Sequence, residues 1–213
     1  MHCPWCSNPE GMNCEGHAKS RTVKEILKEV LSCVPMFFDG GGVTFTGGEA
    51  SLQFQELKEL LEHLKQCGIH TAIETNGTHV KLREYVRLID YWMIDFKHPD
   101  SKKLKEITGI GNEQIKQNIL QITSEKEVHI RIPFIHGFND DADSLDGFLT
   151  YFSMLQDQKA RFDVEILAYH EYGKEKWLRE GKEYAVADGF VSDESVRTFE
   201  QAFKNLGIKV IHT

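Results

Sequence analysis

The sequence lacks any apolar run long enough to span a bilayer, and its opening residues lack the charged and apolar regions of a secretory signal. It has no basic stripe, and its net charge of −8 argues against a nucleic-acid-binding protein. No internal repeat, linker or low-complexity stretch interrupts the 213 residues. We therefore expect a single domain, residues 1–213, that binds neither membrane nor nucleic acid.

Cysteines are few and are not spaced like a disulfide framework. Their number is five, which is odd and favours a reducing, cytoplasmic environment. Cys33 and Cys67 lie in helical patterns, where a free cysteine usually acts as a small buried hydrophobic residue. Cys3 and Cys6 are separated by two residues, and two thiolates at this spacing bind one metal ion or one edge of an iron–sulfur cluster.

Hydrophobic residues make up 40% of the chain, and strand-like segments alternate with segments of helical periodicity. The expected strands are Gly40–Glu49, Ile69–Glu74, Tyr91–Phe96, Val128–Phe134, Phe162–Tyr169 and Ile208–His212. The expected helices are Val23–Leu31, Gln53–Gln66, Val80–Ile89, Ser101–Ile107, Asn112–Ser124, Ala142–Leu155 and Asp193–Leu206, the last one preceded by a polar loop with Trp177. Such alternation implies parallel strands joined by crossover helices. The expected fold class is α/β, a partial (β/α)6-type barrel of parallel strands whose first strand is missing.

Polar and charged residues follow the expected strands at their carboxyl ends, where the chemistry of parallel α/β barrels is located. These ends are Thr46-Gly-Gly-Glu49, Glu74-Thr-Asn-Gly77, Asp95-Phe-Lys97, Arg131-Ile-Pro133 and Tyr169-His170. A purely structural barrel does not need charged groups at so many ends. We therefore expect these groups to meet at one rim.

Each of these features also has a simpler interpretation. The pair Gly47-Gly48 forms a turn in many proteins, because glycine adopts unusual backbone angles. Asp95 and Lys97 share a strand face and fit a solvated ion pair, and a lone histidine such as His170 is more often structural. Glu74 is able to cap its own loop, and Arg131 to pair with a neighbouring carboxylate. Their joint placement, rather than any single residue, favours a functional site.

Taken in order, these segments resemble the radical S-adenosylmethionine (SAM) enzymes, specifically the activating enzymes of glycyl radical enzymes. Cys3-Pro-Trp-Cys-Ser-Asn-Pro9 is similar to the latter part of the family's C-x3-C-x2-C motif, and Gly41 to Glu49 is similar to its GGVTxSGGEP segment. The later strand ends, and Tyr169-His-Glu-Tyr-Gly173 with Lys176-Trp177, match further motifs in the same order. The resemblance covers the chain from Cys3 to its last expected strand.

The resemblance implies that three thiolates hold a [4Fe–4S] cluster and that SAM binds the open iron through its amino and carboxylate groups. An electron from the cluster cleaves SAM, and the 5′-deoxyadenosyl radical takes a hydrogen atom from a glycine of a partner such as pyruvate formate-lyase. In this chain Cys3 and Cys6 are the implied metal ligands. The implied reductant is a flavodoxin or ferredoxin, and the family suggests a monomer.

The resemblance also implies a set of SAM-binding residues: Trp5, Ser7, Gly47, Gly48, Glu49, Asp95, Lys97 and His170. In this set the Gly47–Glu49 stretch contacts the methionyl amino group, and Trp5 to Ser7 lie against the nucleoside. Asp95, Lys97 and His170 bind the ribose and carboxylate end. Glu74 and Asp95 are candidates to hold a monovalent cation near the SAM carboxylate. Loops with Arg131 and Trp177 are candidates to contact the glycine loop of the partner. No residue is assigned as a general acid or base, because the reactive group belongs to the cofactor.

The match departs from the family pattern at its start. The first cysteine of the motif should stand four residues before Cys3, upstream of Met1, so we expect an N-terminally truncated chain. A cluster held by two thiolates alone would be labile. Ala50 stands where the family usually has proline, with little expected effect.

Three alternatives remain open. Cys3, Cys6, Cys14 and His17 have the spacing of a structural zinc set, although a zinc site leaves the strand-end motifs unexplained. A thioredoxin-like role for the two cysteines requires a preceding strand and an immediate helix, which Asn8-Pro9 disfavours. A SAM-binding module that has lost catalysis and acts as a regulatory partner is the third.

Overall fold

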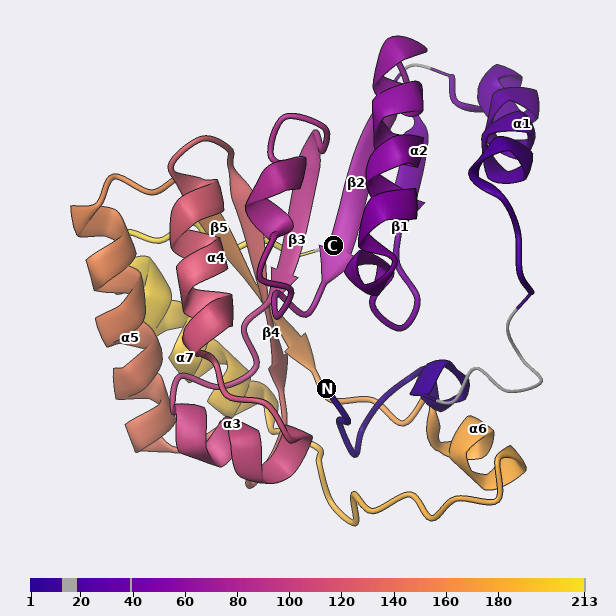
Figure 1. Cartoon of the computed structure of the whole chain (residues 1–213). Coiled ribbons are helices and arrows are strands. Elements are labelled where there is room, and N and C mark those ends of the chain that lie inside the picture. Colours follow the sequence, from indigo (N-terminus) through magenta and orange to yellow (C-terminus); the bar gives the residue numbers. More distant parts are fainter. Residues whose placement is uncertain (13–18, 39, 213) are drawn as a thin grey trace.

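The computed structural model describes residues 1–12, 19–38 and 40–212. Five parallel strands form one sheet in chain order. The strands are β1 (Gly42–Phe45), β2 (His70–Thr75), β3 (Tyr91–Asp95), β4 (Val128–Phe134) and β5 (Phe162–Ala168). The arrowheads of β3, β4 and β5 point toward the end of the sheet where the N-terminal segment lies (Figure 1), and β1 and β2 run parallel to them. The α/β fold with parallel strands, an open partial barrel, is therefore confirmed.

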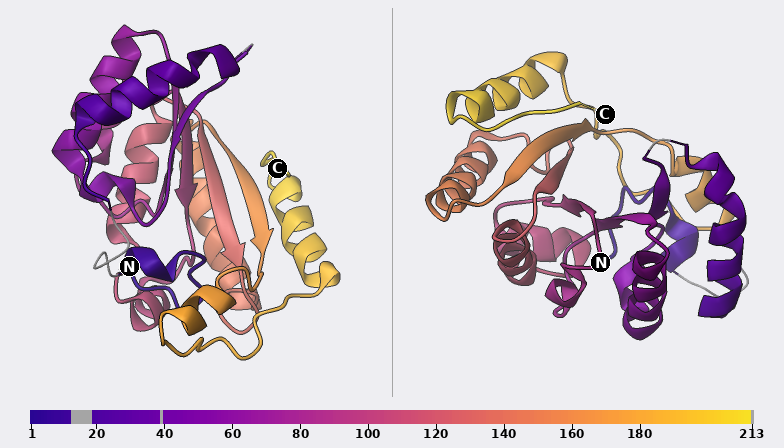
Figure 2. Two further views of the ribbon diagram at one scale, coloured as in Figure 1. Left: turned by 90° about the vertical axis from the view of Figure 1, so that its right-hand side faces the viewer. Right: turned by 90° about the horizontal axis from the view of Figure 1, so that it is seen from above.

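Helices connect the strands and cover the outer side of the curved sheet. The α-helices are α1 (Val23–Cys33), α2 (Phe54–Gln66), α3 (Ser101–Thr108), α4 (Glu113–Thr123), α5 (Ala142–Asp157), α6 (Lys174–Arg179) and α7 (Asp193–Asn205). Short 3-10 helices are η1 (Pro9–Met12), η2 (Val34–Met36), η3 (Ala50–Leu52) and η4 (Leu82–Tyr85). Figure 2 shows α2, α4, α5 and α7 following the outer side, whereas α6 lies beyond the carboxyl ends of the strands. In the part of the chain that the structure describes, no helix has the length and apolar character needed to cross a bilayer.

Alternation along β4 shows how the sheet separates core from site, because successive side chains of a strand point to opposite faces. Val128, Ile130 and Ile132 are fully buried in the hydrophobic core. Arg131 and Pro133, which point the other way, line the cavity described below. One face of β4 therefore packs in the hydrophobic core, while the other face lines the cavity.

The polar face of the sheet continues toward the start of the strands as a buried cluster around His129. The two ring nitrogens of His129 lie 2.6 Å from Asp163 and 3.0 Å from Glu165. All three side chains are less than one tenth exposed, and Lys209 contacts the other oxygen of Asp163 at 3.3 Å. Buried polar groups of this kind need such partners to offset their lost hydration.

Helix boundaries follow the local signals of the sequence. Thr22 and Glu25 form the reciprocal capping box at the start of α1. The leucines of α2 are buried along one side, and the helix ends before Gly68, whose positive φ of 68° suits glycine.

Three expected elements differ from the structure. Val80–Ile89 contains only the short helix η4, because most of its backbone bonds span three residues rather than four, which still places Leu82 and Tyr85 in the core. Ile208–His212 is not a sixth strand, since it forms one bridge, between Val210 and Val164. The expected polar loop around Trp177 contains α6, whose first turn is closed by bonds to the Gly173 carbonyl.

Candidate active site

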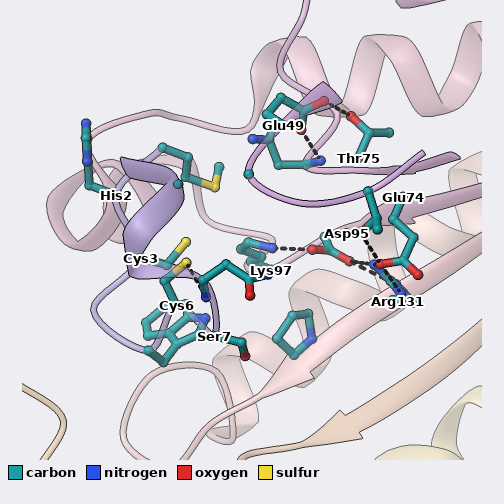
Figure 3. A pocket seen from close by; sticks show the side chains of 18 of the residues that line it. His2, Cys3, Cys6, Ser7, Glu49, Glu74, Thr75, Asp95, Lys97 and Arg131 are labelled. Carbon is teal, nitrogen blue, oxygen red and sulfur yellow. Dashed lines mark hydrogen bonds and ion pairs between the residues drawn. The ribbon is translucent and has the colours of Figure 1, made fainter. Parts of the chain in front are cut away.

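A cavity of about 540 Å³ opens at the carboxyl ends of the strands. All of the expected ligand and SAM-binding residues line it: Cys3, Trp5, Cys6, Ser7, Gly47, Gly48, Glu49, Asp95, Lys97 and His170. Glu74 and Arg131 line it as well. Figure 3 shows side chains from the N-terminal segment facing those from the strand ends across this space. The sequence prediction that these groups meet at one rim is therefore confirmed, while their roles stay predictions.

The two cysteines lie on one tight turn. The backbone N–H of Cys6 donates to the carbonyl of Cys3 at 3.1 Å, and both side chains point into the cavity (Figure 3). The backbone N–H of Asn8 donates to Cys6 Sγ at 3.4 Å. Burial raises the pKa of the Cys3 thiol, which the nearby charge of Lys97 partly offsets.

The donor chemistry of this turn fits two corners of an iron–sulfur cluster, since each thiolate is a soft ligand and both face the same space. Within residues 1–12, 19–38 and 40–212, no three His, Cys, Asp or Glu side chains are arranged to hold a metal ion. The zinc alternative depends on Cys14 and His17, which lie outside the described residues.

The glycine pair after β1 forms a turn against the cavity. Gly47 has a φ of 114°, a conformation that favours glycine. The following carboxylate, that of Glu49, links this turn to the end of β2: it accepts bonds from Thr75 Oγ1 and from the backbone N–H of Asn76, both at 2.7 Å. It also accepts from the hydroxyl of Ser51 at 2.6 Å. Glu49 therefore fixes two strand ends relative to each other.

Four charged side chains form a connected network on the floor of the cavity. Lys97 Nζ lies 2.5 Å from Asp95 Oδ2, and Arg131 Nη2 lies 3.0 Å from Asp95 Oδ1. Arg131 Nη1 also lies 3.4 Å from Glu74. The side chains of Lys97 and Asp95 are only 8% and 19% exposed, so this pair is not the solvated pair of the simpler interpretation. Arg131 does pair with neighbouring carboxylates, while Glu74 accepts from Thr46 across β1 and β2 rather than capping its own loop.

Opposite charges control the ionisation of this network. Burial would raise the pKa of Asp95, but Lys97 and Arg131 hold that pKa below its ordinary value. Burial would likewise lower the pKa of Lys97, but Asp95 raises that pKa above its ordinary value. Asp95 and its two cationic partners, Lys97 and Arg131, therefore stabilise one another's charged forms.

The remaining predicted residues surround the mouth of the cavity. Trp5 packs against Phe138 with ring centroids 4.7 Å apart, and Ser7 follows on the same turn. The ring of His170 stacks on that of Tyr172 at 4.0 Å. Two aromatic surfaces thus flank the opening, which suits a planar base or a sugar.

Trp177 does not line the cavity. Its indole N–H donates to the Cys6 carbonyl at 2.9 Å, so Trp177 stabilises the Cys3–Cys6 turn without lining the cavity. Sequence reasoning also missed Asn8 and Lys176, whose side chains meet at 2.8 Å. Both residues stand within matched motifs, but their contact joins positions 168 residues apart, which no local pattern reveals.

Comparisons with known proteins support the resemblance to radical SAM enzymes that the sequence motifs indicate. A profile of the radical SAM superfamily matches residues 1–148. The 4-hydroxyphenylacetate decarboxylase activating enzyme of Clostridioides difficile (strain CD196) is 32% identical over 197 residues, which cover 90% of this chain and 61% of that enzyme. The pyruvate formate-lyase-activating enzyme of Staphylococcus aureus (strain USA300) is 33% identical over 204 residues, covering 91% of this chain and 80% of that enzyme.

A solved structure shares the fold. The crystal structure of a domain of pyruvate-formate lyase-activating enzyme from Bacteroides vulgatus ATCC 8482 matches with a TM-score of 0.66 and 26% identity, covering 81% of this chain and 98% of that one. The family profile, the relatives and the shared fold all agree with the resemblance seen in the sequence motifs. The chain belongs to the radical SAM superfamily, and within it the chain is similar to activating enzymes of glycyl radical enzymes.

Proposed function

We propose that the chain acts as a radical SAM activase, which cleaves SAM reductively and generates a glycyl radical on a partner enzyme. One observation carries this proposal: a Cys-x2-Cys turn and polar residues from the ends of five parallel strands share a single cavity. A volume of about 540 Å³ is in the range of small-molecule sites. The relatives named as activating enzymes support the proposal.

Cys3 and Cys6 would hold two irons of a [4Fe–4S] cluster, with a further thiolate from outside the described residues. When bound and reduced, the cluster supplies the electron that cleaves SAM. The protein contributes the shielding of Cys3, which is buried, and the N–H of Asn8 that donates to Cys6 Sγ. Exclusion of water from such a site protects a reactive intermediate.

The cavity offers a complementary group for each part of SAM. The carboxylate of Glu49 and the carbonyls of the glycine pair are acceptors for the methionyl ammonium. Lys97 is a donor for the methionyl carboxylate, and Asp95 and His170 would bind the ribose. Trp5 and Ser7 would lie against the base. In this proposal the chain binds and orients SAM and moves no proton itself.

A monovalent cation at Glu74 and Asp95 is a further part of the proposal. Both carboxylates already contact the guanidinium of Arg131, so a cation there has to share them with this side chain. Competition of this kind predicts weak binding of the ion. Titration of SAM binding with sodium and potassium salts tests it directly.

The proposed substrate is a glycyl radical enzyme, which presents its glycine loop at the mouth of the cavity, above the network that contains Arg131. A flavodoxin or ferredoxin is the proposed reductant, and the protein is proposed to act as a monomer in the cytoplasm. The names of the relatives support the glycyl radical enzyme as substrate, whereas the reductant and the monomeric state rest on the family resemblance and the cytoplasm on the cysteine content.

The test mixes the reduced, cluster-loaded protein and SAM with each enzyme named in the relatives: pyruvate formate-lyase, 4-hydroxyphenylacetate decarboxylase and choline trimethylamine-lyase. We expect 5′-deoxyadenosine and an EPR signal of a glycyl radical with one of them. Tight SAM binding without 5′-deoxyadenosine would instead favour the regulatory, non-catalytic module.

A further inference from the structure

Helix α6 contacts the Cys turn directly. The indole N–H of Trp177 donates to the carbonyl of Cys6 at 2.9 Å. Gly173, the residue before the helix, lies so close to the same carbonyl that a Cβ atom at this position would clash with the backbones of Cys6 and Ser7. These contacts join the proposed cluster-binding turn to a helix more than 160 residues later in the chain.

Lys176, on the same helix, makes a second link to this segment. Its Nζ lies 2.8 Å from Asn8 Oδ1 and 2.9 Å from Glu10 Oε1. One lysine therefore joins two residues that follow the turn. Its side chain is 41% exposed, so the ion pair with Glu10 contributes little to the free energy of unfolding.

Asn8 connects this lysine with a cysteine sulfur. Its backbone N–H donates to Cys6 Sγ at 3.4 Å, while its side-chain amide donates to the Gly47 carbonyl at 3.5 Å. With Lys176 on its oxygen and Gly47 on its nitrogen, the side chain of Asn8 is held at both ends. The direction of the N–H toward sulfur depends on that placement. Hydrogen bonds to cluster sulfurs are among the factors that set a cluster's reduction potential.

We propose that Lys176 and Trp177 are positioning residues that hold the Cys3–Cys6 turn in place and keep the N–H of Asn8 on Cys6 Sγ. The contacts exist in the protein alone, but the effect on a reduction potential rests on the proposed function. Neither residue lines the cavity proposed for SAM. The position of the turn and the reduction potential of the cluster are therefore measured in separate experiments.

The first experiment measures alkylation of each cysteine in the metal-free protein by mass spectrometry. In Lys176→Met and Trp177→Phe we expect Cys6 to react about fivefold faster, a factor equivalent to about 1 kcal/mol. Lys176→Arg, which keeps a donor, should restore the slow rate. The matched control is Lys174→Met on the same helix, because within the described part of the chain the side chain of Lys174 pairs with Glu171 alone, at 2.9 Å.

Neither Cys33 nor Cys67 is fully buried, contrary to the sequence expectation. Cys33, half-buried at the end of α1, reports on the fold away from the turn, and Cys67, exposed at the end of α2, reports on the intrinsic alkylation rate. Unchanged rates at these two cysteines, with a faster rate at Cys6, support a local positioning role. Equal rates at Cys6 in wild type and Lys176→Met would overturn the inference.

The second experiment measures the midpoint potential of the reconstituted cluster by EPR-monitored titration. Lys176→Met should lower the potential and Lys174→Met should leave it unchanged; equal potentials would refute the link through Asn8. If no form assembles a cluster, including one with a cysteine added four residues before Cys3, while Cys6 alkylation still accelerates, the positioning role stands and the proposed function fails. If the cluster forms but neither the alkylation rate of Cys6 nor the midpoint potential changes, the proposed function stands and the positioning role fails.

Discussion

The guanidinium of Arg131 holds the carboxylate of Asp95, with Nη2 and Nε at 3.0 and 3.1 Å from Oδ1. The two residues are register partners on the neighbouring strands β3 and β4. Lys97 binds the other oxygen of Asp95 at 2.5 Å. One carboxylate thus fixes two cations on the floor of the cavity, in the place proposed for the polar end of SAM.

Replacement of this carboxylate is expected to weaken SAM binding. In Asp95→Ala both cations lose their common partner and move, so the dissociation constant should rise at least about tenfold, or about 1.4 kcal/mol. Isothermal titration calorimetry measures this change. Asp90→Ala is the control, because Asp90 pairs with Lys65 and Thr71 at the opposite end of β3. Unchanged affinity in a folded Asp95→Ala protein would remove Asp95 from the site.

Arg131 is expected to matter for stability as well. Arg131→Met leaves Glu74 and Asp95 without their shared cation, and breaking a buried ion pair in this way costs about 3–5 kcal/mol. Urea unfolding measures the loss. Arg83→Met is the matched control: Arg83 pairs with Glu125 at 3.3 Å with 60% of its side chain exposed, so its loss should cost about 0–1 kcal/mol. Equal costs for the two variants would contradict the assignment of a buried network.

Acid should remove the contribution of Asp141, the N-cap of α5. Hydrogen bonds from Ser144, with help from Lys103, lower the pKa of Asp141 from 3.8 to about 2. Because the folded-state pKa lies below the unfolded one, the group stabilises the protein above pH 3.8 and loses this effect as the pH falls toward 2. At neutral pH, Asp141→Ala should cost about 1 kcal/mol.

Unfolding at several pH values tests this prediction. The difference between wild type and Asp141→Ala should be constant above about pH 5 and should shrink steadily toward pH 2. A difference that is the same across the whole range would show that the charge of Asp141 contributes nothing.

The strand ends could be predicted from the sequence, because each one is marked by a local pattern of apolar and polar residues and parallel strands follow a general rule of arrangement. Asp95 and Arg131 follow apolar strand residues, and parallel strands bring their carboxyl ends to one rim. The capping box of Thr22 was readable for the same reason, since all of its atoms lie within one turn.

Other features depend on contacts that the local sequence does not contain. Leu82 and Tyr85 have helical spacing, but a tighter 3-10 turn buries them equally well. The bond between Trp177 and Cys6 and that between Lys176 and Asn8 arise only when the loop after β5 folds back over the N-terminal segment. The burial of Lys97 could not be predicted either, because it depends on the neighbouring strands.

The central claim, that Cys3 and Cys6 bind a SAM-responsive cluster, is tested most directly by anaerobic reconstitution with iron and sulfide. EPR spectra with and without SAM would be recorded for the chain, for a form with a cysteine added four residues before Cys3, and for its Cys6→Ala variant. We predict a cluster signal that SAM perturbs in the extended form and no iron–sulfur absorbance in Cys6→Ala. The absence of a cluster from both the chain and the extended form, with zinc bound instead, would contradict the account.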